Sequence, residues 1–330
     1  MKRLYSLYLL MAVFIAVALC SAEDSYAQPQ RKVPIRLGVD VSTMGLAFWV
    51  ADSEGIFDKY GLQAITKTHD IGFMGLLAIG AGEGDTSIQS ESPTVVNIAK
   101  GIDAIIVATI ARGPQTYKAI AKKEIKGPRD LIGKTIGITV GAGGEYFLNQ
   151  YLKKHAIDVR QVTIQDAAPP ELSVMLYKGE LDAVFVWEPF GRKIMGLDKA
   201  ADRLAVFTSG KDYYNATFFL TVGRRFAEQN PEAVKNLLRA LAEANRFIAQ
   251  NKEKCIRITK YILRTSQEEA AAAVEDYVSV PPILEKDALP ALMNISAWLK
   301  EKGRIKSIPD WKTIVQPRYL REVDPSKVQL

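Results

Sequence analysis

The sequence is poor in the residues from which disulfide frameworks, metal sites and catalytic triads are built. It has two cysteines and two histidines in 330 residues. Cys20 directly follows the apolar N-terminal stretch, so Cys255 stands alone if Cys20 is removed with that stretch, and we expect no internal disulfide and a buried Cys255. His69 and His155 show no metal-ligand spacing and complete no Ser-His-acid set. We therefore expect a protein without a metal or other cofactor, and not an enzyme.

Two classes of ligand also lack their usual sequence signatures. The formal net charge is +6, but Lys and Arg are scattered and form no basic stripe, so we expect no nucleic-acid partner. A glycine-rich turn, GAGGE at 141–145, is followed by no Gly-Lys-Ser/Thr and does not match G-x-G-x-x-G. A nucleotide-binding loop is therefore not predicted. Hydrophobic residues make up 48% and charged residues 24% of the chain, which is typical of a folded globular protein.

The first residues have the features of an export signal. Lys2 and Arg3 precede the apolar stretch Leu4–Leu19, which is too short and too poorly flanked to predict a transmembrane helix. Small residues suited to a cleavage site follow at positions 22, 25 and 27. We expect the chain to be exported.

The cleavage position has two alternatives. Cleavage after Ala22 or after Ala27 fits the pattern, and we favour the second, which assigns 1–27 to the signal peptide. Lipid modification at Cys20 would require a small residue before it, whereas Leu19 stands there. We therefore do not expect a lipid anchor.

From Val33 onward, short apolar strands alternate with amphipathic helices. The strands expected first are 33–40, 62–69, 84–89 and 103–110, and the helices are 46–60, 73–80 and 90–101. Parallel βαβ units are the economical explanation of this alternation. Gly127-Pro128 then breaks the chain, and the alternation restarts.

The second block has its own strands and helices. Its expected strands are 135–140, 159–166, 181–187 and 203–209, and its helices are 145–155, 170–178 and 189–201. After a further strand at 216–226 the chain is expected to be almost entirely helical, over 231–250, 253–264, 266–278 and 286–302. The fold class is therefore α/β with two lobes, namely 28–122 with 217–330, and 123–216, and the C-terminal helices pack on the first lobe.

Ligands bind at the carboxyl ends of strands in open α/β sheets, so the loops at these ends are the candidate site. The candidate ligand-binding residues are Ser42, Thr43, Met44, Gly45, Ser90, Glu91, Ser92, Arg112, Gly141, Gly143, Gly144, Trp187, Glu188 and Asn215. Most of them also have a purely structural explanation. The hydroxyl and carboxylate groups could cap helices, the glycines could form a tight turn, Arg112 could be solvated, and Trp187 could close the core.

Three collinear segments resemble a known family. They are RLGVDVSTMGLAFWVADSEGIFDKYGLQ, LIGKTIGITVGAGGEYFLNQYLKKHAIDVRQVTIQD and MLYKGELDAVFVWEPF, which lie within about residues 33–251. The most specific patterns are A-x-x-x-G-x-F-x-K-x-G-L (51–62), D-L-x-G-K-x-I-G (130–137) and G-x-x-D-A-x-x-x-W-E-P (179–189). Together they resemble the SsuA/THI5-like (NMT1-like) periplasmic solute-binding proteins of the sulfonate, nitrate, taurine and thiamine-precursor group.

That resemblance implies a type II periplasmic-binding-protein fold whose two lobes close on a small solute and deliver it to an ABC importer permease. On the family pattern, 42–45, 90–92, 141–144 and 187–188 match cleft positions. A eukaryotic branch makes a thiamine pyrimidine with an active-site histidine and a cysteine-rich motif. Neither is present in the cleft segments here, so that activity is not expected.

The charges near the expected cleft leave the ligand open. Amide groups of the glycine turn and Arg112 would suit a sulfonate, carboxylate or nitrate. Asp40, Glu91 and Glu188 would instead oppose a bare anion and suit a ligand with amine or ring N–H donors.

Aromatic residues in the same region, Phe48, Trp187 and Tyr214, would favour a ligand with an organic body. We therefore expect a small organic solute that bears a sulfonate or carboxylate or is heteroaromatic. The expected state is a monomer, because the lobes must be able to close. A sensor subunit that presents the solute to a signalling partner is the alternative function.

Overall fold

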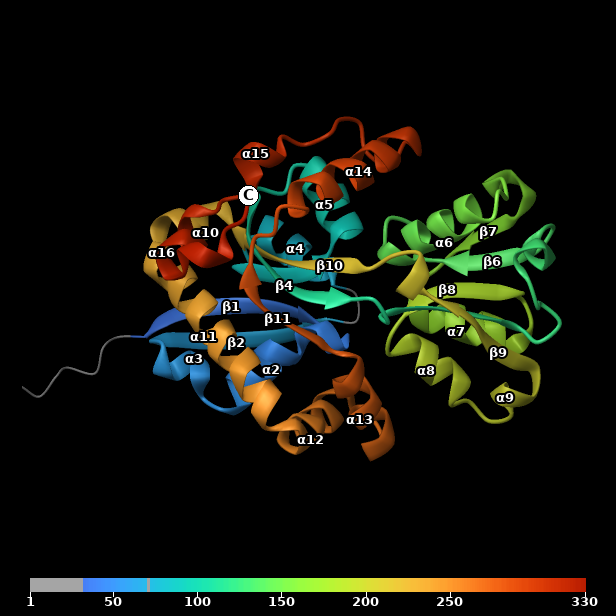
Figure 1. Cartoon of the computed structure of the whole chain (residues 1–330), viewed down its shortest axis with the longest axis horizontal. Helices are drawn as coiled ribbons and strands as arrows, with labels where there is room; N and C mark the ends of the chain where they lie inside the picture. The colour runs from blue at the N-terminus through green and yellow to red at the C-terminus, as the bar shows by residue number, and fades with distance from the viewer. Residues whose placement is uncertain (1–31, 70–71) are drawn as a thin grey trace, which may run out of the picture. The chain divides into compact units, whose positions relative to one another are not determined.

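The computed structural model describes residues 32–69 and 72–330. The expected signal peptide, 1–27, and Cys20 lie outside the described residues. Within the described residues, no helix is both long enough and apolar enough to cross a membrane. The residues from Val33 to Leu330 form two sheets, each surrounded by helices (Figure 1).

The first sheet has six strands among the described residues, and we call it with its helices lobe 1. Its strands in spatial order are β11 (Val278–Ile283), β4 (Ala104–Gly113), β10 (Ala216–Gly223), β3 (Thr86–Ser90), β1 (Val33–Asp40) and β2 (Leu62–His69). β1 runs parallel to both β2 and β3, whereas β10 runs antiparallel to β3 and β4. β1 and β3 therefore end on the same edge of the sheet.

The second sheet has five strands among the described residues, and we call it with its helices lobe 2. Its strands in spatial order are β7 (Thr163–Asp166), β6 (Thr135–Ile138), β8 (Ala183–Trp187), β5 (Tyr117–Lys122) and β9 (Leu204–Ser209). β6 is parallel to β7 and β8, but β5 is antiparallel to β8 and β9. The start of β5 is thus adjacent to the end of β8, where Tyr117 pairs with Trp187.

The helices of lobe 1 come from both ends of the chain. They are α2 (Leu46–Ser53), α3 (Ile56–Lys59), α4 (Phe73–Gly80), α5 (Glu91–Ala99), α10 (Arg224–Gln229), α11 (Pro231–Gln250), α12 (Lys252–Leu263), α13 (Gln267–Asp276), α14 (Ala288–Glu301), α15 (Trp311–Ile314) and α16 (Arg318–Val323). Lys59 and Glu243 form an ion pair of 2.7 Å, which joins α3 to α11. The expectation that the C-terminal helices pack on lobe 1 is confirmed.

Lobe 2 is covered by helices from the middle of the chain. They are α6 (Gly143–Lys154), α7 (Pro169–Lys178), α8 (Phe190–Met195) and α9 (Ala200–Arg203). Short 3₁₀ turns complete the described chain at Thr43–Gly45, Pro128–Leu131, Val159–Gln161, Gly210–Asp212 and Pro325–Lys327. Glycines end or break several helices in the left-handed conformation that suits them. Gly55, at φ 66°, divides the helix expected over 46–60 into α2 and α3.

Two strands were missed, and both sheets are mixed rather than parallel. β5 (Tyr117–Lys122) has lysines and alanines and resembles a polar connector, but it lies inside the second sheet. The lobe boundary expected at 122/123 is therefore corrected, because the chain crosses between the sheets at 114–116 and again at 213–215. β11 carries two prolines, which disfavour an interior strand, and it occupies an edge of its sheet.

Cys255 is buried in α12, as expected, and burial raises the pKa of its thiol to about 11. The thiolate is therefore scarce at neutral pH. This cysteine contributes to packing and is a poor nucleophile.

The contact between α6 and β8 yields a testable prediction. A Cβ at Gly144 would lie 2.4 Å from the carbonyl oxygen of Phe185, so Gly144→Ala must push the helix away from the strand. We expect this change to lower the free energy of unfolding by about 1–3 kcal/mol in urea denaturation. Gly127→Ala is the control, because its Cβ would find no atom closer than 4.0 Å, and we expect a change within about 0.5 kcal/mol. Equal stability of the two variants would contradict this account.

Candidate functional site

A small cavity of about 30 Å³ lies where residues of both lobes meet. From lobe 1 it is lined by Asp40, Ser42, Gly72, Phe73, Gln89, Ser90, Pro93 and Phe218, and from the other side by Thr116, Tyr117, Ala142, Gly143 and Trp187. Asp40 and Ser90 are the last residues of β1 and β3, and Trp187 is the last residue of β8. The cavity therefore occupies the strand-end position at which α/β sheets bind ligands. We call it the cleft cavity.

Asp40 is the one carboxylate among the described residues that line the cleft cavity, and they include no Lys or Arg. Its side chain is buried, and its Oδ1 atom accepts hydrogen bonds from the Ser42 hydroxyl at 2.6 Å and the Ser42 amide at 3.2 Å. Burial penalises the charged form and raises the pKa of Asp40 to about 7, although the two Ser42 bonds oppose this rise. The group can therefore change charge near neutral pH.

Two hydroxyl groups lie close together in the same cavity. Ser90 Oγ and Tyr117 Oη are 3.1 Å apart and share a hydrogen bond between the lobes. The Tyr117 ring packs against Tyr214, with ring centroids 5.0 Å apart, and Tyr214 packs against Tyr146 at the same distance. Burial raises the pKa of Tyr117, so its hydroxyl remains a neutral donor or acceptor.

The start of α6 lies beside these hydroxyls. The first amides of a helix have no partner inside the helix, and no other described residue accepts a hydrogen bond from the amides of Gly143 and Gly144. A Cβ at Gly143 would lie 1.9 Å from Tyr117 Oη, so glycine is required for this close approach. The glycine turn thus has a packing role, and it also leaves amides at the cleft that could hold an anion.

Trp187 and Glu188 have different environments although they are adjacent in sequence. Trp187 lines the cleft cavity and packs edge-on against Phe190, with ring centroids 5.7 Å apart. Glu188 is buried outside the cavity lining, where its Oε2 atom accepts a hydrogen bond of 3.0 Å from the Arg192 amide and caps α8. Burial raises the pKa of Glu188, and its role in this structure is that of a helix cap.

Arg112, Glu91 and Asn215 lie at a second cavity, of about 320 Å³, beside the chain crossings. Arg112 is ion-paired with Glu285 and Asp287, and it donates to Thr217 Oγ1 at 2.6 Å. Arg112 is therefore not part of the lining of the cleft cavity, and acidic residues more than 170 positions later neutralise its charge.

The remaining predicted residues divide into two groups. Ser42, Ser90, Gly143 and Trp187 line the cleft cavity. Thr43, Met44, Gly45, Ser92, Gly141 and Gly144 are next to it in sequence but are not part of its lining. The Ser42 hydroxyl accepts a hydrogen bond of 3.3 Å from the Met44 amide and so caps the short helix there, as its structural explanation required.

Several lining residues were not among the candidates. Gln89, Pro93 and Asp40 lie at the ends of predicted strands or in the loops after them, so the strand-end argument already pointed to them. Thr116 and Tyr117 were missed together with β5, and Phe218 lies within β10, where no sequence signal distinguishes it from core residues.

Contacts outside the cavity also join the two lobes. The Ser92 hydroxyl donates to the carbonyl of Gly141 at 3.0 Å, and Arg192 of α8 is ion-paired with Asp276 of α13. Arg304, which follows α14, is ion-paired with Glu145 of α6 at 2.8 Å. These contacts hold the lobes in an arrangement in which the cleft cavity itself is small.

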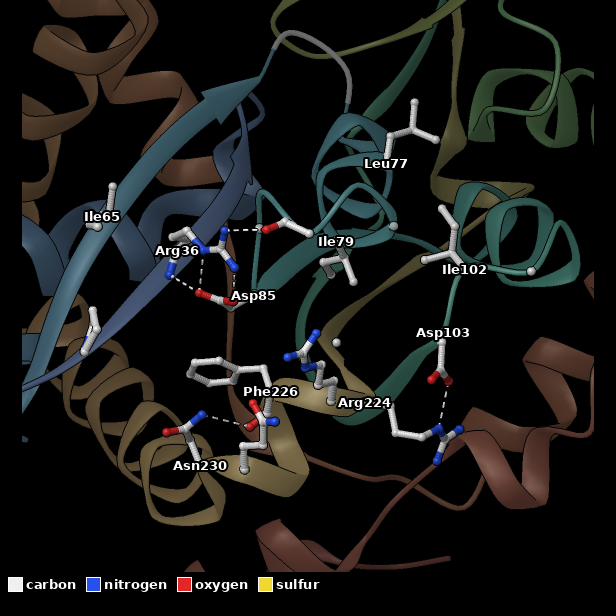
Figure 2. Close-up of a pocket in the computed structure, with 18 of the residues that line it drawn as sticks. Arg36, Ile65, Leu77, Ile79, Asp85, Ile102, Asp103, Arg224, Phe226 and Asn230 are labelled. Carbon is white, nitrogen blue, oxygen red and sulfur yellow. Dashed lines mark hydrogen bonds and ion pairs between the residues drawn. The ribbon is translucent and has the colours of Figure 1, made fainter.

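A much larger hollow, of about 1040 Å³, lies at the other end of the strands of lobe 1 (Figure 2). Arg36 and Asp85 form an ion pair of 2.6 Å on its wall, and Arg224 pairs with Asp103 at 2.8 Å. Its lining comes from lobe 1 alone, so movement of the lobes could not enclose a ligand there. We therefore take the cleft cavity, which both lobes line, as the candidate solute site.

A family model described as NMT1/THI5 like matches residues 43–255. The chain belongs to the NMT1/THI5-like family. This NMT1/THI5-like chain is 22% identical over 286 residues to the taurine-binding periplasmic protein of Escherichia coli, an alignment that covers 82% of this chain and 88% of that protein. The resemblance drawn from the sequence is confirmed.

Solved structures establish the fold of the NMT1/THI5-like chain. The periplasmic aliphatic sulphonate binding protein SsuA of Escherichia coli superposes with a TM-score of 0.75 at 16% identity, over 86% of this chain and 92% of that one. The alkanesulfonate-binding protein SsuA of Xanthomonas axonopodis pv. citri, bound to MOPS, has a TM-score of 0.76 at 15% identity, over 87% and 99%. The fold is the type II periplasmic-binding-protein fold, as expected.

The raised pKa of Asp40 predicts a pH-dependent effect on stability. The carboxyl group of Asp40 has a pKa of about 7 in the folded protein and of about 4 in the unfolded chain. Between pH 4 and 7 the unfolded chain therefore releases this proton while the folded protein keeps it. Because proton release favours the unfolded chain, the free energy of unfolding falls as the pH rises. Asp40→Asn removes the titrating carboxyl group and with it this pH-dependent loss of stability. We expect it to gain about 2–4 kcal/mol of unfolding free energy over the native chain at pH 8, and little at pH 4.

Urea denaturation at pH 4, 5.5, 7 and 8 would measure this difference. Asp103→Asn is the control, because Asp103 is exposed at the far end of lobe 1, and its effect should not grow between pH 5.5 and 8. An Asp40→Asn difference that stays constant over the whole range would show that burial does not raise this pKa.

Proposed function

We propose that this chain is an exported receptor that captures a small organic solute between its lobes and delivers it to an ABC importer. The observation that carries this proposal is the cleft cavity, whose lining combines the ends of β1 and β3 with Tyr117, Gly143 and Trp187 from the other side. A site divided in this way binds most tightly when the lobes close, and closure is then a signal that a permease can detect.

The chemistry of the lining supports an organic solute with an anionic group. The unpaired amides at the start of α6 and the hydroxyls of Ser90 and Tyr117 could donate to a sulfonate or carboxylate. Trp187 and Phe218 offer an apolar surface for the rest of the molecule. The taurine and sulfonate specificities in the names of the relatives agree with this choice.

The cavity volume of about 30 Å³ is about that of one water molecule, so a solute requires the lobes to separate and close again around it. The two crossings, 114–116 and 213–215, are short segments at which such a hinge motion can occur. We include in the proposal a monomeric state, cleavage of residues 1–27 on export and a periplasmic location.

Ligand binding by the purified protein tests the proposal. A thermal-shift screen would use alkanesulfonates, taurine, nitrate, pyrimidines, flavins and aromatic carboxylates, and we expect a sulfonate or carboxylate to raise the melting temperature by several degrees. At one hundred times its Kd a ligand stabilises the folded state by about 2.7 kcal/mol. A panel without any hit would count against a solute receptor.

Trp187 provides a residue-level test of the same site. We expect Trp187→Ala to weaken the binding of the identified solute by about tenfold or more, because an aromatic wall of the cleft is removed. Phe226→Ala is the control, since Phe226 lines the separate hollow in Figure 2 and its loss should leave affinity unchanged. Because Trp187 is almost fully buried, Trp187→Phe would be measured as well. A fall in stability with unchanged affinity in both variants would assign Trp187 to the core alone.

The ion pair between Arg192 and Asp276 tests the closure mechanism without altering the cleft lining. We expect Arg192→Ala to lower the fraction of closed protein and weaken solute binding by about 3- to 10-fold, since apparent affinity falls with the population of the competent state. Small-angle scattering without solute should show a larger radius of gyration. Arg224→Ala, which breaks a pair within lobe 1, should change neither quantity. The same affinity in both variants would exclude this pair from closure.

A further inference from the structure

The carboxylate of Asp40 has one oxygen atom without a hydrogen-bond partner among the described residues. Both hydrogen bonds from Ser42 go to Oδ1, and no described residue donates to Oδ2. The side chain is 6% exposed, and the space beside Oδ2 is kept open by Gly72, where a Cβ would lie 3.0 Å from this atom. Asp40 and Gly72 both line the cleft cavity, so the unpartnered oxygen is at the solute site.

A buried carboxylate without a cation is costly, and none of the described residues that line the cavity supplies a Lys or Arg to this one. Among the described residues, Tyr117 of β5 interacts electrostatically with Asp40 and remains neutral, and His69 is opposite Asp40 in the register of β1 and β2. Glu91 of α5 adds a further acidic group near Tyr117. A positively charged ligand group would therefore be the strongest partner available to Oδ2.

From this arrangement we propose that Asp40 binds a protonated nitrogen of the solute, so that the receptor selects amine-bearing organic acids over anions that lack an amine. The proposal rests on the receptor function above and names its substrate class. A short amino-sulfonate or amino-carboxylate places its ammonium group at Asp40 Oδ2 and its anionic group at the amide of Gly143, at the start of α6.

The same cavity disfavours a solute that is only an anion. Such a solute would find helix amides and two hydroxyls but would also meet the charge of Asp40, with no Lys or Arg in the described lining to offset it. An amine on the solute therefore strengthens binding in two ways. It donates a hydrogen bond to Oδ2 of Asp40, and its positive charge offsets the repulsion between Asp40 and the anionic group of the solute. Discrimination of this kind depends on a buried polar group that an analogue without the amine leaves unpaired.

Isothermal titration of the purified protein with two matched pairs of probes tests this inference. Taurine is compared with ethanesulfonate and β-alanine with propionate, and in each pair the second compound differs by loss of the amine. We expect at least one amine-bearing probe to bind the native protein more than about tenfold more tightly than its partner. Asp40→Asn keeps the shape of the side chain and should remove that preference, with a loss of about tenfold or more for the amine-bearing probe and less than about threefold for the other.

Asp103→Asn is the matched control, because it removes the same charge from the far end of lobe 1 and should leave both affinities unchanged. A second readout is the pH dependence. Binding of the amine-bearing probe should strengthen from pH 6 to 8 in the native protein more than in Asp40→Asn, which retains His69 and so isolates the part due to Asp40.

Two results would overturn the inference and leave the receptor function intact. One is tight binding of ethanesulfonate or propionate without any gain from the amine, or of another member of the thermal-shift panel that carries no amine. The other is unchanged discrimination in Asp40→Asn. Failure of every probe and of every panel member would instead count against the receptor function as well.

Discussion

The buried carboxylate of Glu91 holds together the region on which the rest of the site depends. It stands at the first turn of α5, accepts a hydrogen bond from the Tyr214 hydroxyl and accepts another, of 2.7 Å, from the amide of Thr217. The second chain crossing, 213–215, is thereby fixed to lobe 1. Burial raises the pKa of Glu91, and these donors compensate its charge in the absence of a ligand.

The position of Tyr214 then determines the position of Tyr117. The two rings are in contact, and Tyr117 carries the hydroxyl that meets Ser90 across the cleft and the ring against which Gly143 packs. A chain of contacts therefore runs from the second crossing to the cavity wall. Because each member is buried, a movement of the crossing cannot leave the cavity unchanged. The crossing and the cleft cavity are coupled by packing rather than by a flexible linker.

Much of the fold could be predicted, because local signals mark most elements. β1 and β2 have the expected bounds, since an apolar strand before a polar loop and a left-handed Gly61 after α3 are local features. β5 and β11 were missed because their own composition does not mark them as strands. They are strands because they pair with neighbouring strands in the folded chain. The candidate site residues divide in the same way, between those marked by local sequence signals and those whose contacts arise only in the folded chain. The position of Trp187 at a strand end could be predicted, whereas the ion pairs of Arg112 could not, because Glu285 and Asp287 reach it only through the fold.

The two prolines of β11 have a consequence beyond strand pairing. Pro281 and Pro282 lack backbone N–H groups, and β11 is the outermost strand on its side of the first sheet. An exposed edge with a full row of donors would invite another chain to add a strand. A proline-bearing edge cannot extend the ladder regularly, and it protects the chain against aggregation through this edge of its sheet.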